Sequence, residues 1–593
     1  MNRQDFFDGR IFDAYRYFGA HIVEHGVVFR VFAPNAAKVT LTGAFNSWGE
    51  DELSRDGTGG FFTHTVPSAK AGQFYKYRIY TRDGRVVEHC DPYGFAMERR
   101  PGCCSVITDL DAYRFSDGEW MAARTASTDL PLNIYEMHPG SWRRNPEDKE
   151  NGWYRYDELA DLLIPYLREH GFTHVEFLPL SEHPFDGSWG YQNTGFFAPT
   201  SRYGTPDQLK ILIDRLHQAG IGAILDFVPV HFAVDSYGLA QFDGTHLYEY
   251  PHAAVGESEW GSFNFIHSRR ETRCFLQSAA NYWLSEFHFD GLRMDAVSRL
   301  IYWQGDETRG VNGDALDFLK TMNAGLKERH PSVLLVAEDS TAFAGVTRPV
   351  SERGLGFDYK WDLGWMHDTL EYFQTQPDLR PRDRHKLTFS MEYFANERYL
   401  LPFSHDEVVH GKASIVQKMY GADPAQKFAQ ARALYLYMFA HPGKKLNFMG
   451  AELGMLREWD DAGELDWSLD SAPQHQAFHT FFRALCQLYR AHPALCADYA
   501  PGNFSWLDSP EEAPCVFAFT RSNADERLAA VFNLSDEPCT DCTLPIGSAA
   551  VLLSTENVSF GGAAKETACS FLSNSDETTL NLPPYSGLLL QIG

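Results

Sequence analysis

A strand–loop–helix pattern repeats along the middle of the chain, from about residue 131 to residue 485. One clear repeat pairs THVEFLPL (173–180), an apolar run of strand length, with TPDQLKILIDRLHQAG (205–220), whose leucines and isoleucine recur at helical spacing. Thr205 is expected to be the N-cap of that helix and Pro206 its first residue. Strands that alternate with helices indicate a parallel sheet covered by helices, which restricts this region to the α/β class.

The number of repeats predicts the closure of the sheet. The predicted strands are NIYEMHPGSW (133–142), THVEFLPL (173–180), IGAILDFVPV (221–230), FDGLRMDAV (289–297), SVLLVAEDS (332–340), a weaker candidate near GFDYKWD (356–362), LLPFSHDEV (400–408) and KKLNFMGAE (444–452). A (β/α)8 TIM barrel consists of eight β/α units, so these strands and their helices predict that fold, here with long loops. One local feature conflicts with the pattern, because Pro165 lies inside the predicted helix 157–170 and should kink it or end it early.

The segments on either side of the barrel show short apolar runs separated by turn residues. Runs such as GVVFRVFAP and QFYKYRIYT before the barrel, and RLAAVFNLS and GLLLQIG after it, predict two β-sandwiches. The fold class is therefore α/β, with a central (β/α)8 barrel flanked by N-terminal and C-terminal β-sandwich domains. The expected division is an N-terminal extension (1–19), a β-sandwich module (20–110), a linker (111–130), the (β/α)8 barrel (131–490) and a C-terminal β-sandwich (491–593).

Composition and charge exclude several classes of partner. The 593 residues include 52 Lys and Arg against 79 Asp and Glu, and the resulting formal charge of −27 repels nucleic acid and anionic membrane surfaces. No apolar run approaches the ~20 residues of a membrane span, and the N-terminus has no stretch of signal-peptide type. The ten cysteines show no regular disulfide or zinc framework, which is typical of a cytoplasmic protein.

Charged residues gather where the predicted barrel strands end, and in a barrel of this kind the carboxyl ends of the strands form the catalytic face. These residues are Asp226, His231, Arg293, Asp295, Glu338, His405 and Asp406. A single acid at such a place is most often a helix cap or a loop charge. Several carboxylates on one rim repel one another, so the set indicates a function. His231 and His405 are expected either to hydrogen-bond a ligand or to orient the carboxylates.

Two functions would use these acids, namely metal binding and acid–base chemistry on a neutral substrate. Arg293 beside Asp295 argues against a metal, because a guanidinium repels a cation and already neutralises the acid. The same arginine would keep Asp295 ionised as a nucleophile. Glu338 is the natural group to stay protonated and act as acid and then as base, while Asp406 remains to hold a sugar or to stabilise positive charge. This is the arrangement of a retaining glycosidase.

Four segments resemble the four sequence regions of the α-amylase family of glycosidases and glycosyl transferases, in matching order and spacing. They are DFVPVH (226–231), GLRMDAV (291–297), AEDS (337–340) and FSHDEV (403–408). The resemblance implies Asp295 as nucleophile, Glu338 as general acid/base and Asp406 as transition-state stabiliser. Around the sugar that reacts it implies contacts from Asp226, His231, Arg293 and His405.

Longer stretches resemble 1,4-α-glucan (glycogen) branching enzymes. They are YEMHPGSWRR (135–144), GSWGYQNTGFFAPTSRYGTP (187–206), FSHDEVVHGK (403–412) and NFMGAELGMLREWDDAGELDW (447–467), while FRVFAPNAAKVTLTGAFNSW (29–48) and DPYGFAMERRPG (91–102) are similar to the glucan-binding sandwich of that family. The resemblance implies that Tyr191 lines the donor sugar site. Because only about 20 residues precede the sandwich, the further N-terminal domain of many bacterial members is expected to be absent.

The resemblance implies a double displacement. Asp295 would attack the anomeric carbon of an α-1,4 bond while Glu338 protonates the leaving oxygen, and Glu338 would then deprotonate the 6-hydroxyl of an acceptor glucan. An α-1,6 branch would form with retained configuration, and no cofactor or metal is needed. The expected partners are amylose, glycogen and maltooligosaccharides, with no nucleic acid and no membrane. The chain is expected to act as a monomer in the cytoplasm.

Two alternatives remain open at this point. A hydrolase of the same family, of amylase, debranching or trehalose-releasing type, would share the three acids and differ only in using water as the acceptor. A non-catalytic glucan-binding protein would need no nucleophile, and the presence of all three acids opposes it.

Overall fold

The computed structural model describes residues 1–508, 512–564, 571–573 and 576–593, which divide into two compact units. Unit one comprises residues 1–126, 138–164 and 176–358, and unit two comprises residues 127–137, 165–175 and 359–593. Among the described residues, no helix is long and apolar enough to cross a membrane.

Eight strands hydrogen-bond in chain order to form a closed barrel. The barrel strands are β10 (Asn133–Met137), β11 (His174–Phe177), β14 (Gly222–Phe227), β17 (Gly291–Met294), β18 (Leu334–Ala337), β19 (Tyr359–Trp361), β20 (Tyr399–Phe403) and β21 (Lys444–Phe448). The predicted (β/α)8 fold is confirmed, including the weak candidate strand near 356–362. Most of these strands are buried on both faces, which explains why they read as continuous apolar runs.

The helices of the barrel follow its strands. Those of unit one are α3 (Pro139–Trp142), α5 (Pro206–Gln218), α6 (Ala253–Gly256), α7 (Arg270–Glu286), α8 (Ser298–Ile301) and α9 (Gly313–Arg329). Those of unit two are α10 (Leu363–Gln374), α11 (His385–Thr388), α12 (Ser390–Tyr393), α13 (Ile415–Lys418), α14 (Pro424–Ala440) and α15 (Pro473–Ala491), and α4 (Tyr156–His170) precedes β11. Two short two-stranded sheets also belong to unit one: β12 (Ser181–Glu182) with β13 (Gly195–Pro199), and β15 (His231–Phe232) with β16 (Phe263–Asn264).

Local sequence determines how two of these helices begin and continue. Helix α5 starts as predicted, because the Thr205 hydroxyl accepts the amide of Gln208 at 3.3 Å and the Gln208 side chain accepts the amide of Thr205 at 2.9 Å. Helix α4 continues through Pro165 to His170, so the predicted early end is wrong. Proline removes one backbone hydrogen bond there, and burial of the apolar face, as at Leu163, outweighs that loss.

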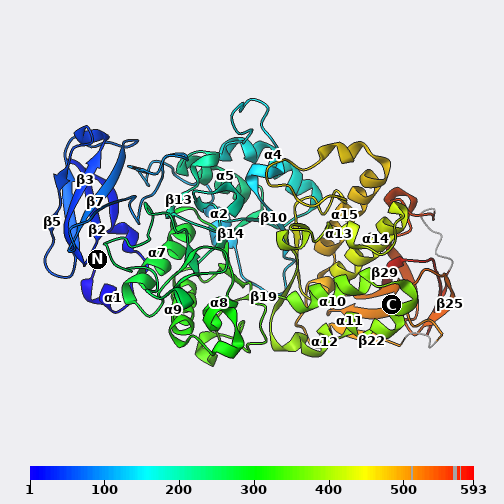
Figure 1. Ribbon diagram of the computed structural model, residues 1–593. Coiled ribbons are helices and arrows are strands. Elements are labelled where there is room, and N and C mark those ends of the chain that lie inside the picture. The colour runs from blue at the N-terminus through cyan, green and yellow to red at the C-terminus, as the bar shows by residue number, and fades with distance from the viewer. Residues whose placement is uncertain (509–511, 565–570, 574–575) are drawn as a thin grey trace. The chain divides into compact units, whose positions relative to one another are not determined.

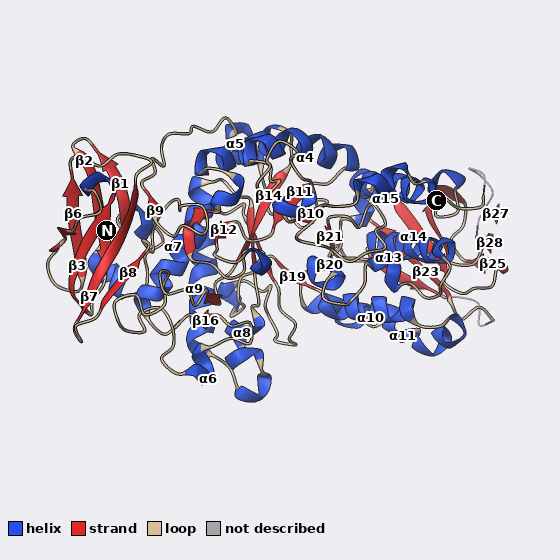
Figure 2. Ribbon diagram, turned by 45° about the horizontal axis from the view of Figure 1, so that its top comes forward, coloured by secondary structure: helices blue, strands red, loops and turns tan. Residues whose placement is uncertain are grey.

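The N-terminal part of unit one is a two-sheet sandwich (Figure 1, blue). The first sheet consists of β1 (Gly19–Val23), β2 (Gly26–Phe32), β6 (Phe61–Val66) and β5 (Ser54–Arg55). The second sheet consists of β4 (Asp51–Glu52), β3 (Ala36–Gly43), β7 (Phe74–Thr81), β8 (Val86–His89) and β9 (Ser105–Val106) (Figure 2, red). The sheets meet through aromatic rings, such as Phe29 and Tyr75 with centroids 5.0 Å apart. Strand β7 alternates between fully and partly buried residues, as expected for a strand with one buried face.

Two segments that were predicted as an extension and a linker have secondary structure in unit one. Helix α1 (Arg3–Phe7) packs near helix α7 (Figure 1), and the amide of Ala14 donates to the Ser278 hydroxyl at 3.0 Å. The predicted linker contains α2 (Gly118–Ala123), whose Trp120 indole donates to Asp290 at 2.8 Å. The proposed domain boundaries themselves stay predictions.

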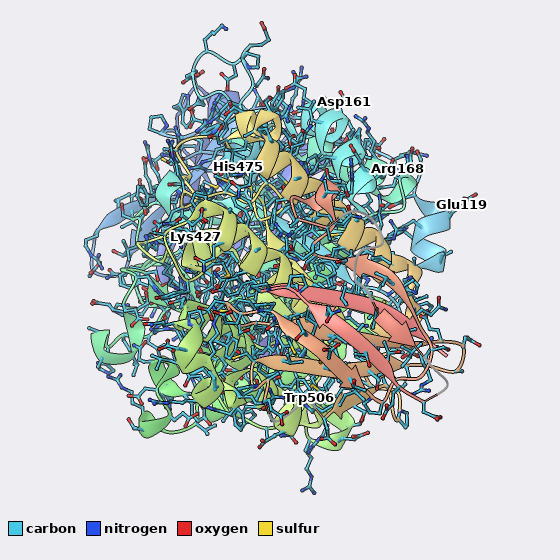
Figure 3. All side chains as sticks on the ribbon, turned by 90° about the vertical axis from the view of Figure 1, so that its right-hand side faces the viewer. Glu119, Asp161, Arg168, Lys427, His475 and Trp506 are labelled. Carbon is cyan, nitrogen blue, oxygen red and sulfur yellow. The ribbon has the colours of Figure 1, made fainter. Side chains whose placement is uncertain are left out.

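The C-terminal part of unit two is also a two-sheet sandwich. One sheet has β22 (Phe504–Leu507), β23 (Val516–Ser522), β24 (Arg527–Asn533), β29 (Ser586–Ile592) and β26 (Ala549–Ser554); the other has β25 (Cys539–Leu544), β28 (Thr578–Leu582) and β27 (Phe571–Ser573). Side chains of both sheets, among them Val531, Leu590 and Leu580, form one core cluster. Helix α14 packs on strand β29 (Figure 3), which buries the outer face of the first sheet.

Candidate active site

Strands β14 and β17 place an acid opposite a base inside unit one. Asp226 and Arg293 are direct partners in the parallel register of these strands, and both are buried. Arg293 Nη1 lies 2.7 Å and 2.6 Å from the two carboxylate oxygens of Asp226. A buried charge needs a partner of this kind, because desolvation of an unpaired guanidinium would be costly.

Arg293 contacts two further carboxylates. Its Nη1 lies 3.1 Å from Asp295 Oδ1, and its Nη2 donates to Glu338 Oε2 at 2.8 Å. Burial alone would lower the pKa of Arg293, but the charges of Asp226 and Glu338 outweigh burial and raise the pKa well above its usual value. Arg293 is therefore a permanent cation shared by three acids. Its contact with Asp295 is the predicted one, and its shortest contact is with Asp226.

The loop after β17 fixes the positions of Asp295 and Glu338. Strand β17 ends at Met294, so Asp295 lies just beyond it, with its amide donating to the Phe227 carbonyl at 3.0 Å. Ala296 has a φ of 47°, in the left-handed region, and its amide donates to Glu338 Oε2 at 2.9 Å. A non-glycine residue in that conformation destabilises the folded state by about 1–3 kcal/mol, so the contacts around the turn must hold it in place. Glu338 is held by this amide as well as by Arg293.

His231 and Tyr191 complete the set of contacts in unit one. The Tyr191 hydroxyl donates to Asp226, and His231 Nε2 lies 3.9 Å from Asp295 Oδ2. Burial, with a smaller effect of the Arg299 charge, lowers the pKa of His231 to about 3. The imidazole is therefore neutral at neutral pH. Among the described residues, its buried Nδ1 has no hydrogen-bond partner.

His405 and Asp406 lie together in unit two, in the one-turn helix His405–Val408 that follows β20. The His405 amide donates to Glu136 Oε2 at 2.9 Å, and His405 Nδ1 lies 2.6 Å from Glu136 Oε1. His405 Nε2 lies 3.5 Å from Asp406 Oδ1. Glu136 is thus the residue that fixes the orientation of His405. Sequence reasoning missed this role, although an acid within the buried strand β10 was a signal for it.

The predicted residues fall into two connected sets. Unit one joins one set through hydrogen bonds and ion pairs, namely Tyr191, Asp226, His231, Arg293, Asp295 and Glu338, and unit two joins His405 and Asp406. In the part of the chain that the structure describes, no group of three or more His, Cys, Asp and Glu residues could hold a metal ion. Two carboxyl groups on one guanidinium, one of them buried and one partly exposed, can supply a nucleophile and a proton donor.

Family models match three parts of the chain. They are "Carbohydrate-binding module 48 (Isoamylase N-terminal domain)" at residues 17–94, "Alpha amylase, catalytic domain" at residues 161–245, and "Alpha amylase, C-terminal all-beta domain" at residues 506–593. These matches agree with the sandwich–barrel–sandwich order of the fold.

Curated proteins named "1,4-alpha-glucan branching enzyme GlgB" are similar over most of the chain. The protein from Marinobacter nauticus is 44% identical over 87% of this chain and 84% of its own length. The protein from Geobacillus stearothermophilus is 43% identical over 90% of this chain and 84% of its own length. The protein from Bacillus subtilis is 40% identical over 99% of this chain and 96% of its own length.

Solved structures with a similar fold include two pullulanases. One from Anoxybacillus, complexed with maltotetraose, has a TM-score of 0.76 at 18% identity and covers 100% of this chain and 89% of that one. One from Paenibacillus barengoltzii has a TM-score of 0.74 at 19% identity and covers 97% of this chain and 94% of that one. At 18% and 19% identity, the similarity to these two structures shows a shared fold.

Proposed function

The chain belongs to the 1,4-α-glucan branching enzymes of the α-amylase family, and we propose that it acts by a retaining double displacement at the carboxylates around Arg293. A branching enzyme cleaves an α-1,4-glucosidic bond and transfers the cut segment to a 6-hydroxyl, which creates an α-1,6 branch. The observation that carries the proposal is that one guanidinium contacts both Asp295 and Glu338. The two carboxyl groups that the reaction needs therefore lie close enough to act on the same glycosidic bond.

Asp295 is the nucleophile in this proposal. Its carboxylate lies 3.1 Å from Arg293 Nη1, and an ionised carboxylate can attack the anomeric carbon to form a glycosyl-enzyme. The side chain is mostly buried, so little water competes for its lone pairs. The amide of Asp295 is bonded to the Phe227 carbonyl, which fixes the backbone from which the attack occurs.

Glu338 is the general acid and then the general base. Its side chain is more exposed than that of Asp295, at 21% against 12%, as befits a group that exchanges protons with the leaving oxygen and with an incoming hydroxyl. Arg293 and the Ala296 amide hold the same oxygen, Oε2, so the other oxygen is the one that transfers the proton.

The remaining residues hold the sugar. Asp226, Tyr191 and Arg293 form one hydrogen-bonded group beside the nucleophile, and His231 Nε2, which lies 3.9 Å from Asp295 Oδ2, is the ring nitrogen that would bond a sugar hydroxyl. Asp406 stabilises the positive charge that develops on the ring in the transition state, and His405 binds the sugar in the orientation that Glu136 imposes.

The partners that this chemistry requires are neutral α-1,4-glucans such as amylose, glycogen and maltooligosaccharides. The net charge of −27 supports a protein that binds neither nucleic acid nor an anionic membrane. We propose that it works as a monomer in the cytoplasm, and sedimentation of the purified chain would test the oligomeric state.

The test compares Asp295→Asn and Glu338→Gln with Asp306→Asn, which changes an exposed acid of the same unit. Both site variants should lower the branching rate by about three orders of magnitude or more while the circular dichroism and melting temperature change little. Asp306→Asn should retain the full rate. Branching of amylose lowers iodine absorbance with few new reducing ends, whereas hydrolysis raises reducing ends in step. A folded Asp295→Asn variant with near-normal branching would refute the proposal.

A further inference from the structure

A half-exposed tryptophan lies beside the proposed site in unit one. Trp260 is in the turn between α6 and β16, and 46% of its surface is exposed. The centroid of its ring lies 5.3 Å from that of the His231 imidazole, and His231 Nε2 lies 3.9 Å from Asp295. Trp260 and the proposed nucleophile Asp295 therefore both lie next to His231.

Several contacts fix the position of this indole. The Gln192 side chain donates to the Trp260 carbonyl at 2.9 Å, and Gln192 directly follows Tyr191, which bonds Asp226. The Trp260 amide donates to the Ser258 hydroxyl at 3.2 Å. The Arg299 guanidinium lies 4.2 Å from the ring centroid, which is cation–π geometry. The ring is thus held in place by its own chain before any ligand arrives.

Arg299 is itself anchored, which keeps one face of the ring covered. Its side chain pairs with Glu259 and donates to Gln304 Oε1 at 2.9 Å. About half of the Trp260 surface remains exposed, and its ring lies next to His231 of the proposed sugar site. A pyranose ring has an apolar C–H face that can pack on such a surface while its hydroxyls stay hydrated.

We propose that Trp260 binds the glucosyl unit next to the one that reacts, and thereby favours long α-glucan chains over short sugars. This inference rests on the proposed function of Asp295 and His231. The competing role for Trp260 is purely structural, as a wedge that keeps His231 in place. The two roles differ in what they change, because a stacking contact is made in the ground state and the transition state alike.

Kinetics separate the two roles. Trp260→Ala should raise KM for amylose and for maltoheptaose roughly tenfold, with kcat within about twofold of wild type. Trp260→Phe keeps a flat ring and should recover most of the affinity. Trp506→Ala, which removes a tryptophan from strand β22 of the C-terminal sheet, serves as the matched control and should leave KM unchanged.

Binding without turnover gives an independent readout. In an Asp295→Asn background, calorimetry with maltoheptaose should show a roughly tenfold weaker Kd when Trp260→Ala is added, and no change when Trp506→Ala is added. A fall in kcat with unchanged KM, an unchanged Kd, or a Phe variant no better than the Ala variant would each overturn the proposal. If Asp295→Asn itself branches amylose normally, the proposed function fails, while the Kd comparison still tests Trp260.

Discussion

The stability of unit one should depend on pH through a buried histidine, His217. Its Nδ1 lies 2.8 Å from Asp117 Oδ2 and its Nε2 lies 2.9 Å from Asp290 Oδ2. The imidazole is fully buried on helix α5, and Asp290 directly precedes β17, the strand that carries Arg293. With both ring nitrogens donating to carboxylates, the histidine is held as an imidazolium.

The magnitude follows from the shift in pKa. Burial alone would lower the pKa of His217, but the hydrogen bonds to Asp117 and Asp290 outweigh burial and raise the pKa from 6.5 to about 9. The pKa of Asp117 is lowered, against the effect of its burial, by His217 and His288, so this acid stays ionised near neutral pH. A raised folded-state pKa stabilises the protein fully below the unfolded value of 6.5, and this stabilisation is lost as pH rises through 9. The difference corresponds to about 3 kcal/mol.

The assay is urea unfolding of wild type and His217→Gln at pH 6 and at pH 9.5, followed by tryptophan fluorescence. At pH 6 the free energy of unfolding of wild type should exceed that of His217→Gln. At pH 9.5 this difference between the two proteins should be smaller by about 3 kcal/mol. His246→Gln, which removes a partly exposed histidine that contacts Glu249, is the control for the loss of a histidine as such. A difference between wild type and His217→Gln that is the same at both pH values would refute the reasoning.

Two further predictions concern unit two. Glu136→Gln should lower the branching kcat about 10- to 100-fold without unfolding the chain, because His405 loses the charged acceptor that orients it. Initial rates of branching test this prediction, and a rate equal to that of wild type would contradict it. Lys444→Met should destabilise the protein by about 1–3 kcal/mol, because the buried ammonium contacts Asp498 at 3.1 Å and donates to three backbone carbonyls, while Arg521 still pairs with Asp498. Lys445→Met should destabilise the protein less, since burial lowers the pKa of Lys445 well below normal; urea unfolding that ranks the two variants the other way would contradict this.

The overall architecture was predictable because it depends on local patterns. Helix α5 carries its capping box and its apolar stripe in its own sequence, and the buried barrel strands read as apolar runs of strand length. The order of the runs, strand then helix, was enough to predict the barrel. The continuation of α4 through Pro165 was not predictable in the same way, because packing outside the helix decides it.

The identities of the proposed site residues were also visible in the sequence, but their partners were not. Nothing local to Arg293 shows that it faces Asp226, because that pairing depends on the register of two parallel strands far apart in the chain. The same holds for Glu136 and His405, and for the turn that brings Trp260 to His231. Contacts between distant segments follow from the closed barrel, which the sequence determines only as a whole.

The central claim is that Asp295 becomes covalently attached to the sugar. A fluorinated maltosyl fluoride, which slows breakdown of the glycosyl-enzyme, should label wild-type protein once per chain, and digestion followed by mass spectrometry should find the added sugar on the peptide that contains Asp295. The label should disappear in Asp295→Asn. A label on Asp226 or Asp406, or one that persists in Asp295→Asn, would contradict the account.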